Sequence, residues 1–284
     1  MHRLTISLST LVFLISLLFP GMAAAQTSTP PVIGIDHIPV VVTNLEQAEA
    51  DYRRLGFSIK PGRPHTSGIR NAHVKFPDGT EIELITAPAA LDALTTEYQA
   101  KMKSGDGPVY FGLYAPDRTT LTTKLLASGF PVQNNEGILT FPSSSLLHPL
   151  FFGSRNKSPT DKPEYFAHAN SAARLSALWV RGNQELRALL GGLGKPSTVD
   201  PPCTPFSAPG ENSVTLPEGH VYLVPSVSAN VVAARVEVRS LAILESVLRS
   251  NHVAITKTRC DAGAIWISPT TAHGIWLQFI ALER

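Results

Sequence analysis

Two histidines and two glutamates stand out among apolar, β-branched residues near the start of the chain. His37 interrupts the run IGIDHIPVVV, His73 lies in RNAHVKF, and TEIELI contains Glu81 and Glu83. Imidazoles and carboxylates bind divalent transition metals, and the same groups can transfer protons near neutral pH. Such chemistry requires the four side chains to share one surface, which the surrounding elements decide.

The three segments have the composition of β-strands, in which side chains alternate between two faces. In the first strand, His37 lies on the opposite face from Ile38 and Val40, which we expect to pack against a helix. In TEIELI the apolar residues take the helix side, so Glu81 and Glu83 point to the concave side. The same reasoning leaves three polar residues of RNAHVKF on the concave side, Asn71, His73 and Lys75.

The turn PDG between the last two strands sets their register. A three-residue loop with Gly79 in the left-handed conformation pairs Phe76 with Thr80. Residues paired across strands lie within roughly 5 Å at Cβ. Counting back from the turn pairs polar residues with one another, Lys75 with Glu81 and His73 with Glu83.

We therefore expect His37, His73 and Glu83 to converge on one wall. Two imidazoles and one carboxylate suit a divalent metal such as Fe, Mn, Ni or Zn, with open positions for substrate. Two metal-free alternatives remain open. The wall could line a pocket for a polar molecule, with a cross-strand hydrogen bond between His73 and Glu83, or it could be a buried structural network.

Further residues are candidates for catalysis or substrate binding. Glu83 or Glu81 is the candidate proton acceptor if metal binding does not fully engage it. Tyr110 is a candidate hydrogen-bond donor or weak acid, and a core position is its alternative. The candidate substrate contacts are His65, Asn71 and Lys75, with a solvated loop position as the alternative for His65.

The elements around these residues recur along the chain. Residues 33–86 predict a strand, a helix and three short strands, with Gly56 ending the helix. The pair Gly129-Phe130 repeats Gly56-Phe57, and Gly194 matches Gly56 again. We expect an α+β fold of four βαβββ modules arranged as two pairs, each with a concave sheet face and helices outside.

The N-terminal segment is typical of a secretory signal. Residues 1–25 combine a short positive start, an apolar run of nine residues and small residues before Gln26. The apolar run is shorter than the ~20 residues that span a bilayer, so we expect no stable membrane anchor after cleavage. The protein would then be exported, to the periplasm or outside the cell. In that setting Cys203 and Cys260 could form one disulfide or remain two buried thiols.

The remaining sequence divides into a first module pair, a connector rich in proline and polar residues, and a second module pair, at residues 30–153, 154–171 and 172–284. With 43% hydrophobic residues and 16% charged residues, the chain can bury a core. Its net charge is +2 with scattered lysines and arginines, which argues against a nucleic-acid partner. The partner we expect, from the concave wall, is a small-molecule substrate or ligand. The oligomeric state stays open.

The start DHIPVVVTNLEQAEADYRRLGF, the end DGTEIELI and the repeated modules resemble the vicinal oxygen chelate superfamily, which includes glyoxalase I, extradiol dioxygenases and bleomycin-resistance proteins. GRPHTSGIRNAHVKFPDGTEIELI and FAHANSAARL resemble its glyoxalase-like branch. In this superfamily a metal takes a histidine from a first strand and a glutamate from a fourth strand, which correspond to His37 and Glu83. Ligands from the paired module are not matched, because the other equivalent positions hold Tyr110, Leu175, Val232 and Gln278.

The resemblance implies two functions. One is a metal-dependent lyase, isomerase or dioxygenase for a small oxygen-rich substrate, in which the metal stabilises an enolate or a similar anion. The other is a metal-free protein that binds a small molecule without catalysis, as bleomycin-resistance proteins do. Whether the protein is an enzyme is left open.

Overall fold

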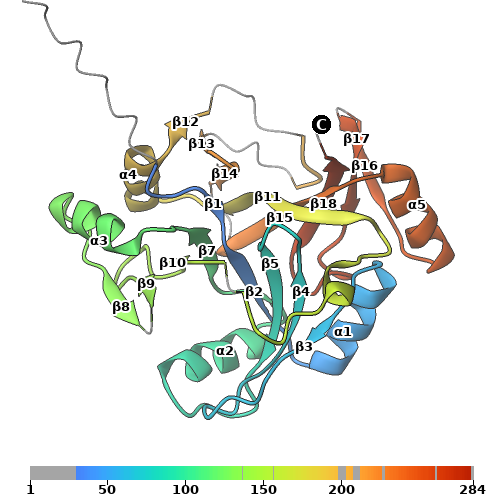
Figure 1. The fold of residues 1–284 in the computed structure, drawn as a ribbon, viewed down its shortest axis with the longest axis horizontal. Coiled ribbons are helices and arrows are strands. Elements are labelled where there is room, and N and C mark those ends of the chain that lie inside the picture. The colour runs from blue at the N-terminus through green and yellow to red at the C-terminus, as the bar shows by residue number, and fades with distance from the viewer. Residues whose placement is uncertain are drawn as a thin grey trace, which may run out of the picture.

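Strands at the centre of the molecule form sheets that helices cover from outside, in the computed structural model drawn in Figure 1. The expected mixed class of helices and sheets is confirmed. The structure describes residues 30–135, 137–155, 157–197, 203–206, 212–225, 228–259 and 261–282. The predicted signal peptide and Cys260 lie outside these residues. Cys203 is disulfide-bonded. None of the described helices is long and apolar enough to cross a bilayer.

The first quarter of the fold contains the predicted strand, helix and three further strands. Two short strands precede the helix, β1 (Gly34–Ile35) and β2 (His37–Val41), with a break at Asp36. The elements that follow are α1 (Leu45–Arg54), β3 (Lys60–Pro61), β4 (Arg70–Lys75) and β5 (Glu81–Thr86). The strand order is β2-β5-β4-β3, and β2 runs parallel to β5. An additional helix, α2 (Ala93–Lys103), leads to the next strand.

The same strand order appears three more times. The second set is β6 (Gly107–Pro108), β7 (Phe111–Tyr114), α3 (Arg118–Ala127), β8 (Gln133–Asn135), β9 (Ile138–Thr140) and β10 (Leu150–Gly153). The third is β11 (Ala172–Arg181), α4 (Gln184–Leu193), β12 (Lys195–Pro196), β13 (Asn212–Leu216) and β14 (Gly219–Val224). The fourth is β15 (Val231–Val238), α5 (Leu241–Ser250), β16 (Thr256–Thr258), β17 (Asp261–Ile267) and β18 (Trp276–Ala281). In each set the strand directly before the helix runs parallel to the last strand, and β6 pairs instead with β2 of the first set.

The two halves of the chain join their strand sets differently. In the second half, β11 pairs antiparallel with β15 and makes one eight-stranded sheet. In the first half, β1 pairs with β7 in one five-stranded sheet, and β2 pairs with β6 in another. A hydrogen bond from the Asp36 amide to the Gly112 carbonyl, at 2.9 Å, spans the break between them. This break affects the site described below.

Helix α1 shows why the local sequence folds as it does. Its buried face consists of Leu45, Ala48 and Tyr52, and Gly56 ends the segment with a φ of +90°. Asn44 caps the helix by accepting a hydrogen bond from the Gln47 amide.

The connector ties the first half to the second half. A short 3₁₀ helix, Pro163–Phe166, precedes His168, whose Nδ1 accepts from the Ser58 amide at 3.0 Å and whose Nε2 donates to the Lys75 carbonyl at 3.0 Å. Asn170 donates to the Leu55 carbonyl at 2.9 Å. Burial lowers the pKa of His168 to about 4, so its imidazole is neutral at physiological pH. These two residues therefore have a structural role.

Candidate functional site

Strands β2, β4 and β5 bring the candidate residues onto one wall. In the antiparallel pair, His73 lies opposite Glu83 and Lys75 lies opposite Glu81, as the turn predicts. The turn itself has the expected form, since the Phe76 amide donates to the Thr80 carbonyl at 2.9 Å and Gly79 has a φ of +89°. In the parallel pair, His37 lies opposite Glu81. The predicted register is confirmed.

The imidazole of His37 lies between two carboxylates. Its Nδ1 bonds to Asp36 Oδ1, and its Nε2 lies 3.8 Å from Glu83 Oε2. The other oxygen of Glu83 accepts a hydrogen bond from the Asn71 amide at 2.6 Å. Both sides of the gap are thus anchored by other contacts. A separation of 3.8 Å is too long for a direct hydrogen bond, so the two groups face each other as an ion pair with a gap between them.

Asp36 is a site residue that strand alternation misses. Neighbouring residues in a regular strand point to opposite faces, so Asp36 would be expected on the helix side. The break between β1 and β2 turns its carboxylate toward His37. The carboxylate is buried, with 3% of the residue exposed, and it accepts from the Arg155 amide at 2.6 Å. Gly153 makes room for it, because a Cβ there would lie 2.5 Å from Asp36 Oδ2.

The charges of His37 and Asp36 follow from their contacts. Burial lowers the pKa of His37, but the hydrogen bond and charge of Asp36, together with the charges of Glu83 and Glu81, outweigh burial and raise the pKa to about 9. Burial raises the pKa of Asp36, and its contacts with His37 and Arg155 bring it below the ordinary value. His37 is therefore a cation at neutral pH, held by an ionised Asp36.

His73 bonds to a different carboxylate from the one its register suggests. Its Nδ1 lies 2.5 Å from Glu81 Oε1, so the side chain leans diagonally away from Glu83. Burial lowers the pKa of His73, but Glu81 and Glu83 raise it above the ordinary value. The expected cross-strand hydrogen bond between His73 and Glu83 is not the one formed.

Lys75 takes part in a buried ion cluster with the connector. Its Nζ lies 2.9 Å from Asp161 and 3.8 Å from Glu81, and Lys60 Nζ lies 2.5 Å from Asp161. Burial raises the pKa of Asp161, but Lys60 and Lys75 lower it to about 2. Sequence reasoning missed Lys60 and Asp161, because a contact between the first module and the connector has no local signal.

The donor set falls short of a three-ligand metal centre. His37 Nε2 and Glu83 Oε2 converge, while the Nδ1 of His73 is engaged by Glu81. In the second strand set the position equivalent to Glu83 holds Phe151, which pairs with Gly112, and its ring centre lies 4.8 Å from that of His37. Across the described ranges, no group of three or more His, Cys, Asp or Glu side chains is arranged to hold a metal ion. Catalytic metal sites usually have three protein ligands.

Tyr110 belongs to a neighbouring cluster. Its hydroxyl donates to Glu97 on α2 and lies 3.3 Å from His148 Nε2, which in turn lies 3.0 Å from Glu97. Burial and Glu97 raise the pKa of Tyr110. This hydroxyl is engaged by Glu97, so no contact in the described residues joins it to His37 or Glu83. His65 is half-buried, and its Nε2 has no hydrogen-bond partner among the described residues.

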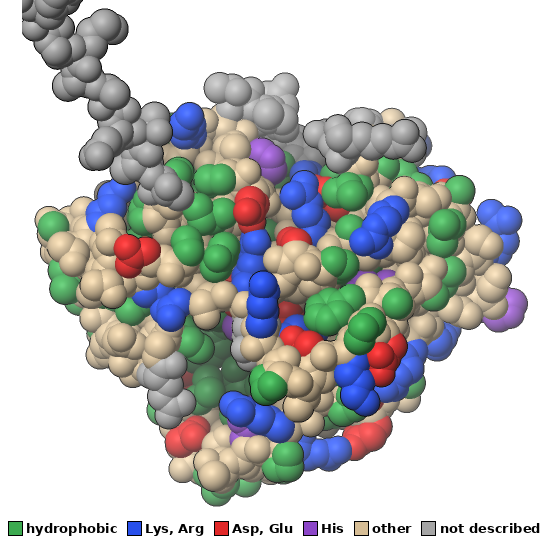
Figure 2. Space-filling view, viewed as in Figure 1, with side chains coloured by type: hydrophobic (Ala, Val, Ile, Leu, Met, Phe, Trp, Pro, Cys, Tyr) green, Lys and Arg blue, Asp and Glu red, His purple; other side chains and the backbone are tan. Residues whose placement is uncertain are grey.

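An apolar patch continues the concave wall. It contains five buried residues with three half-buried ones packed on them, namely Val41, Ile69, Ile85, Ala87, Tyr98, Met102, Val109 and Tyr110. Figure 2 shows the surface hollowed in this half of the molecule, between the strands β8 to β10 and α2, with hydrophobic side chains inside the hollow. The charged wall and the patch together suit a ligand with a polar and an apolar end.

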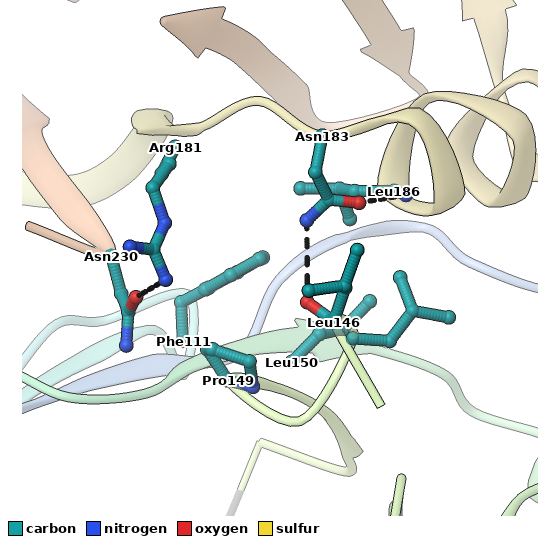
Figure 3. Close-up of a pocket in the computed structure, with 9 residues that line it drawn as sticks. Phe111, Leu146, Pro149, Leu150, Arg181, Asn183, Leu186 and Asn230 are labelled. Carbon is teal, nitrogen blue, oxygen red and sulfur yellow. Dashed lines mark hydrogen bonds between the residues drawn. The ribbon is translucent and has the colours of Figure 1, made fainter. Parts of the chain in front are cut away.

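A second pocket lies where the halves of the chain meet, and Figure 3 shows its lining. Arg181 donates to Asn230 at 2.7 Å, and Asn183 donates to the Leu146 carbonyl at 3.2 Å. Asn183 also caps α4 by accepting from the Leu186 amide at 2.8 Å. These polar groups bond to one another, so we assign this pocket to the packing of the two halves.

Two of the equivalences expected from the sequence are wrong. Leu175 lies in the core on the helix side, because β11 contains register shifts near it. In the fourth set Arg235 pairs with Gln278, as Pro39 pairs with Glu83, so the residue equivalent to His37 is Ala233 and not Val232. Irregular pairing changes which residue faces the concave side.

Comparisons with known proteins agree with this fold. Residues 35–188 match the family described as Glyoxalase-like domain. A mutant of 4-hydroxymandelate synthase from Streptomyces coelicolor has a TM-score of 0.59 at 9% identity, over 88% of this chain and 92% of its own. The 2,3-dioxygenase LapB from Pseudomonas sp. KL28 has a TM-score of 0.58 at 14% identity, over 90% of this chain and 94% of its own.

A hypothetical protein from Staphylococcus aureus has a TM-score of 0.57 at 12% identity and is covered over its full length, with 88% of this chain. No curated protein matches the sequence. At these identities the solved structures show the shared fold alone.

Proposed function

We propose that the first half of this chain, which belongs to the glyoxalase-like domain family of the vicinal oxygen chelate superfamily, binds a small oxygen-rich molecule at His37 and Glu83. The gap of 3.8 Å between His37 Nε2 and Glu83 Oε2 carries this proposal. A ligand hydroxyl placed there would accept from the imidazolium and donate to the carboxylate, at ordinary hydrogen-bond distances of about 2.8 Å. Charge-assisted hydrogen bonds of this kind are stronger than neutral ones.

The same pair supports one chemical step. With a ligand carbonyl oxygen on His37 Nε2, Glu83 would take a proton from the adjacent carbon, and the imidazolium would stabilise the enolate oxygen that forms. Asp36 keeps His37 charged during this step, because its carboxylate bonds to the Nδ1 side of the ring. Return of the proton to the ligand at a neighbouring atom would complete an isomerisation.

A metal-dependent variant is the second candidate, and the Asp36 contact favours it. A carboxylate on Nδ1 that turns Nε2 toward a second carboxylate is the usual setting of a metal-binding histidine. His37 and Glu83 would hold the ion, which would supply Lewis-acid polarisation of the ligand oxygen. The missing third protein ligand is the point against this variant.

Elemental analysis together with ligand binding tests both candidates. Purified protein and its His37→Ala and Glu83→Gln variants are analysed for Fe, Mn, Ni and Zn, and melting temperatures are recorded with α-hydroxy acids, α-keto acids and catechols, with and without a chelator. We expect at least one compound to raise the melting temperature in the presence of chelator, and this increase to disappear in both variants.

Glu46→Gln serves as the matched control, because this glutamate is exposed on α1. Near-stoichiometric metal that disappears in His37→Ala would instead establish the metal-dependent variant. Compounds that raise the melting temperature of parent and variants equally would contradict both candidates.

We also propose that the protein is exported. The support is the N-terminal pattern of charge, apolar run and small residues. Mass spectrometry of the protein recovered from its native host should give a mature N-terminus at Gln26. Recovery of the intact N-terminus from the cytoplasm would contradict export.

A further inference from the structure

The concave face of the second half is lined by aromatic rings instead of acids and histidines. Trp179 from β11 stacks on Tyr222 from β14, with ring centres 4.8 Å apart at 24°, and meets Trp266 from β17 edge-on at 5.6 Å. Phe206 and Trp276 pack against Trp266 at 5.9 Å and 6.3 Å. The rest of the buried face is small or aliphatic, namely Ala177, Val224, Ala233 and Ala264.

One cation lies against this aromatic face. The guanidinium carbon of Arg235 lies 5.3 Å from the centre of the Trp179 ring and 5.7 Å from that of Tyr222. Its Nε donates to Gln278 Oε1 at 2.6 Å. In the described part of the chain, no carboxylate pairs with Arg235 and its two Nη groups make no hydrogen bond. The rings and Gln278 therefore hold a half-buried guanidinium whose outer edge is free.

Three buried groups on the same face lack partners. The indole nitrogens of Trp179 and Trp266 and the Nε2 of Gln278 have no hydrogen-bond partner among the described residues, and all three residues are 0% exposed. Each of these atoms is an N–H donor. A buried donor without an acceptor is unfavourable, and such groups are rare in folded proteins unless a function requires them. A purely structural core offers no reason to gather three of them beside an unpaired cation.

We propose that this face binds the carboxylate of a planar aromatic acid. Arg235 and Gln278 would donate to the carboxylate oxygens, and the indole N–H groups would share these oxygens. The ring would pack against the half-buried side chains at the edge of this face, Val232, Trp276 and Ile280. The unpartnered buried atoms of this face are N–H donors, and they lie beside a positive charge. An acid therefore fits better than a neutral amide, which carries no negative charge and adds N–H donors of its own. The inference is independent of the function proposed for the first half.

The chain has an intrinsic probe for this site. Its three tryptophans are residues 179, 266 and 276, all on this face, so tryptophan fluorescence reports on it and not on the first half. Purified protein is titrated with benzoate, benzamide and acetate. We expect a saturable change in fluorescence with benzoate. The dissociation constant for benzamide should be at least about tenfold larger, because charge-assisted hydrogen bonds are lost, and acetate should bind more weakly still because it has no ring.

Variants separate a binding role from a structural one. Arg235→Gln should weaken benzoate binding about tenfold or more, while Arg187→Gln, at an exposed position on α4, should leave it unchanged. His37→Ala should also leave it unchanged. Trp266→Phe removes one unpartnered donor and should weaken binding severalfold without lowering the melting temperature, a combination that a merely structural tryptophan would not show.

No saturable response to benzoate would overturn the proposal, as would equal affinity for benzamide. Unchanged benzoate affinity in Arg235→Gln would also overturn it. If Arg235→Gln fails to fold, Trp266→Phe and Gln278→Leu decide the question, and parent-like affinity in both variants contradicts the site.

Discussion

The two halves of this protein use the same strand order to build opposite linings. The concave wall of the first half holds ionised groups, with His37 between Asp36 and Glu83 and with Lys75 paired to Asp161. The concave wall of the second half holds tryptophans and Arg235. Since the backbone pattern is shared, the difference comes from which side chains occupy the concave positions, and function in this fold is decided there.

The linings also differ in how completely their polar groups are satisfied. In the first half nearly every charged atom of the wall has a partner, apart from the gap between His37 and Glu83. Asn71 Oδ1, beside Glu83, is a buried acceptor without a partner among the described residues. In the described part of the second half, the buried side-chain atoms without a partner are two indole nitrogens, Gln278 Nε2 and the Ser176 hydroxyl. No carboxylate of the described residues pairs with Arg235. Removing a charge should therefore destabilise the first half, and removing a donor should leave the second half as stable or more so.

The largest expected effect is on the ion cluster of the first half. Asp161→Ala leaves Lys60 and Lys75 buried without a full counter-charge, and both residues are less than a tenth exposed. We expect a loss of about 3 kcal/mol in the free energy of unfolding, measured by urea denaturation. Glu164→Ala, which breaks the exposed pair with Lys162, should cost less than about 1 kcal/mol. Equal losses in the two variants would show that the cluster is not effectively buried.

The pH dependence of stability tests the charge on His37. Its pKa is about 9 in the folded protein and 6.5 in the unfolded chain, so the folded state binds more protons between these values. The stabilisation is complete below pH 6.5 and is lost as the pH rises through 9, up to about 3 kcal/mol.

Asp36→Asn should remove most of this slope, because the partner that raises the pKa is gone. The measurement is urea denaturation of both proteins at pH 6 to 10. A parallel decline in parent and variant would contradict the assignment. His168 acts in the opposite direction, because its lowered pKa makes folding less favourable as the pH falls from 6.5 toward 4.

The smallest expected effect is in the second half and has the opposite sign. Trp266→Phe removes an unsatisfied indole N–H and some ring volume, so the gain of up to about 1 kcal/mol from losing the buried donor is partly offset by a cavity. We expect an unfolding free energy within about 1 kcal/mol of the parent. A loss above about 3 kcal/mol would mean that the indole serves the core and that the two linings are equally structural.

Much of the first wall could be predicted from local sequence. Alternation placed Asn71, His73 and Lys75 on one face, and the PDG turn set the register that pairs His73 with Glu83. Both rest on short-range geometry, the pleat of a strand and the conformation of Gly79. The same reasoning failed at Asp36, where the strand breaks, and at Leu175 and Val232, where irregular pairing shifts the count by one residue.

By itself the sequence determined the strand, helix and turn pattern and the face on which most polar side chains lie, because these depend on neighbours a few residues apart. The tertiary structure decided which charges pair. Asp161 of the connector pairs with Lys60 and Lys75, Phe151 fills the position equivalent to Glu83, and Arg235 lies over rings from other strands. Such contacts join residues far apart in the chain, and their partners are selected only when the sheets and the connector pack together.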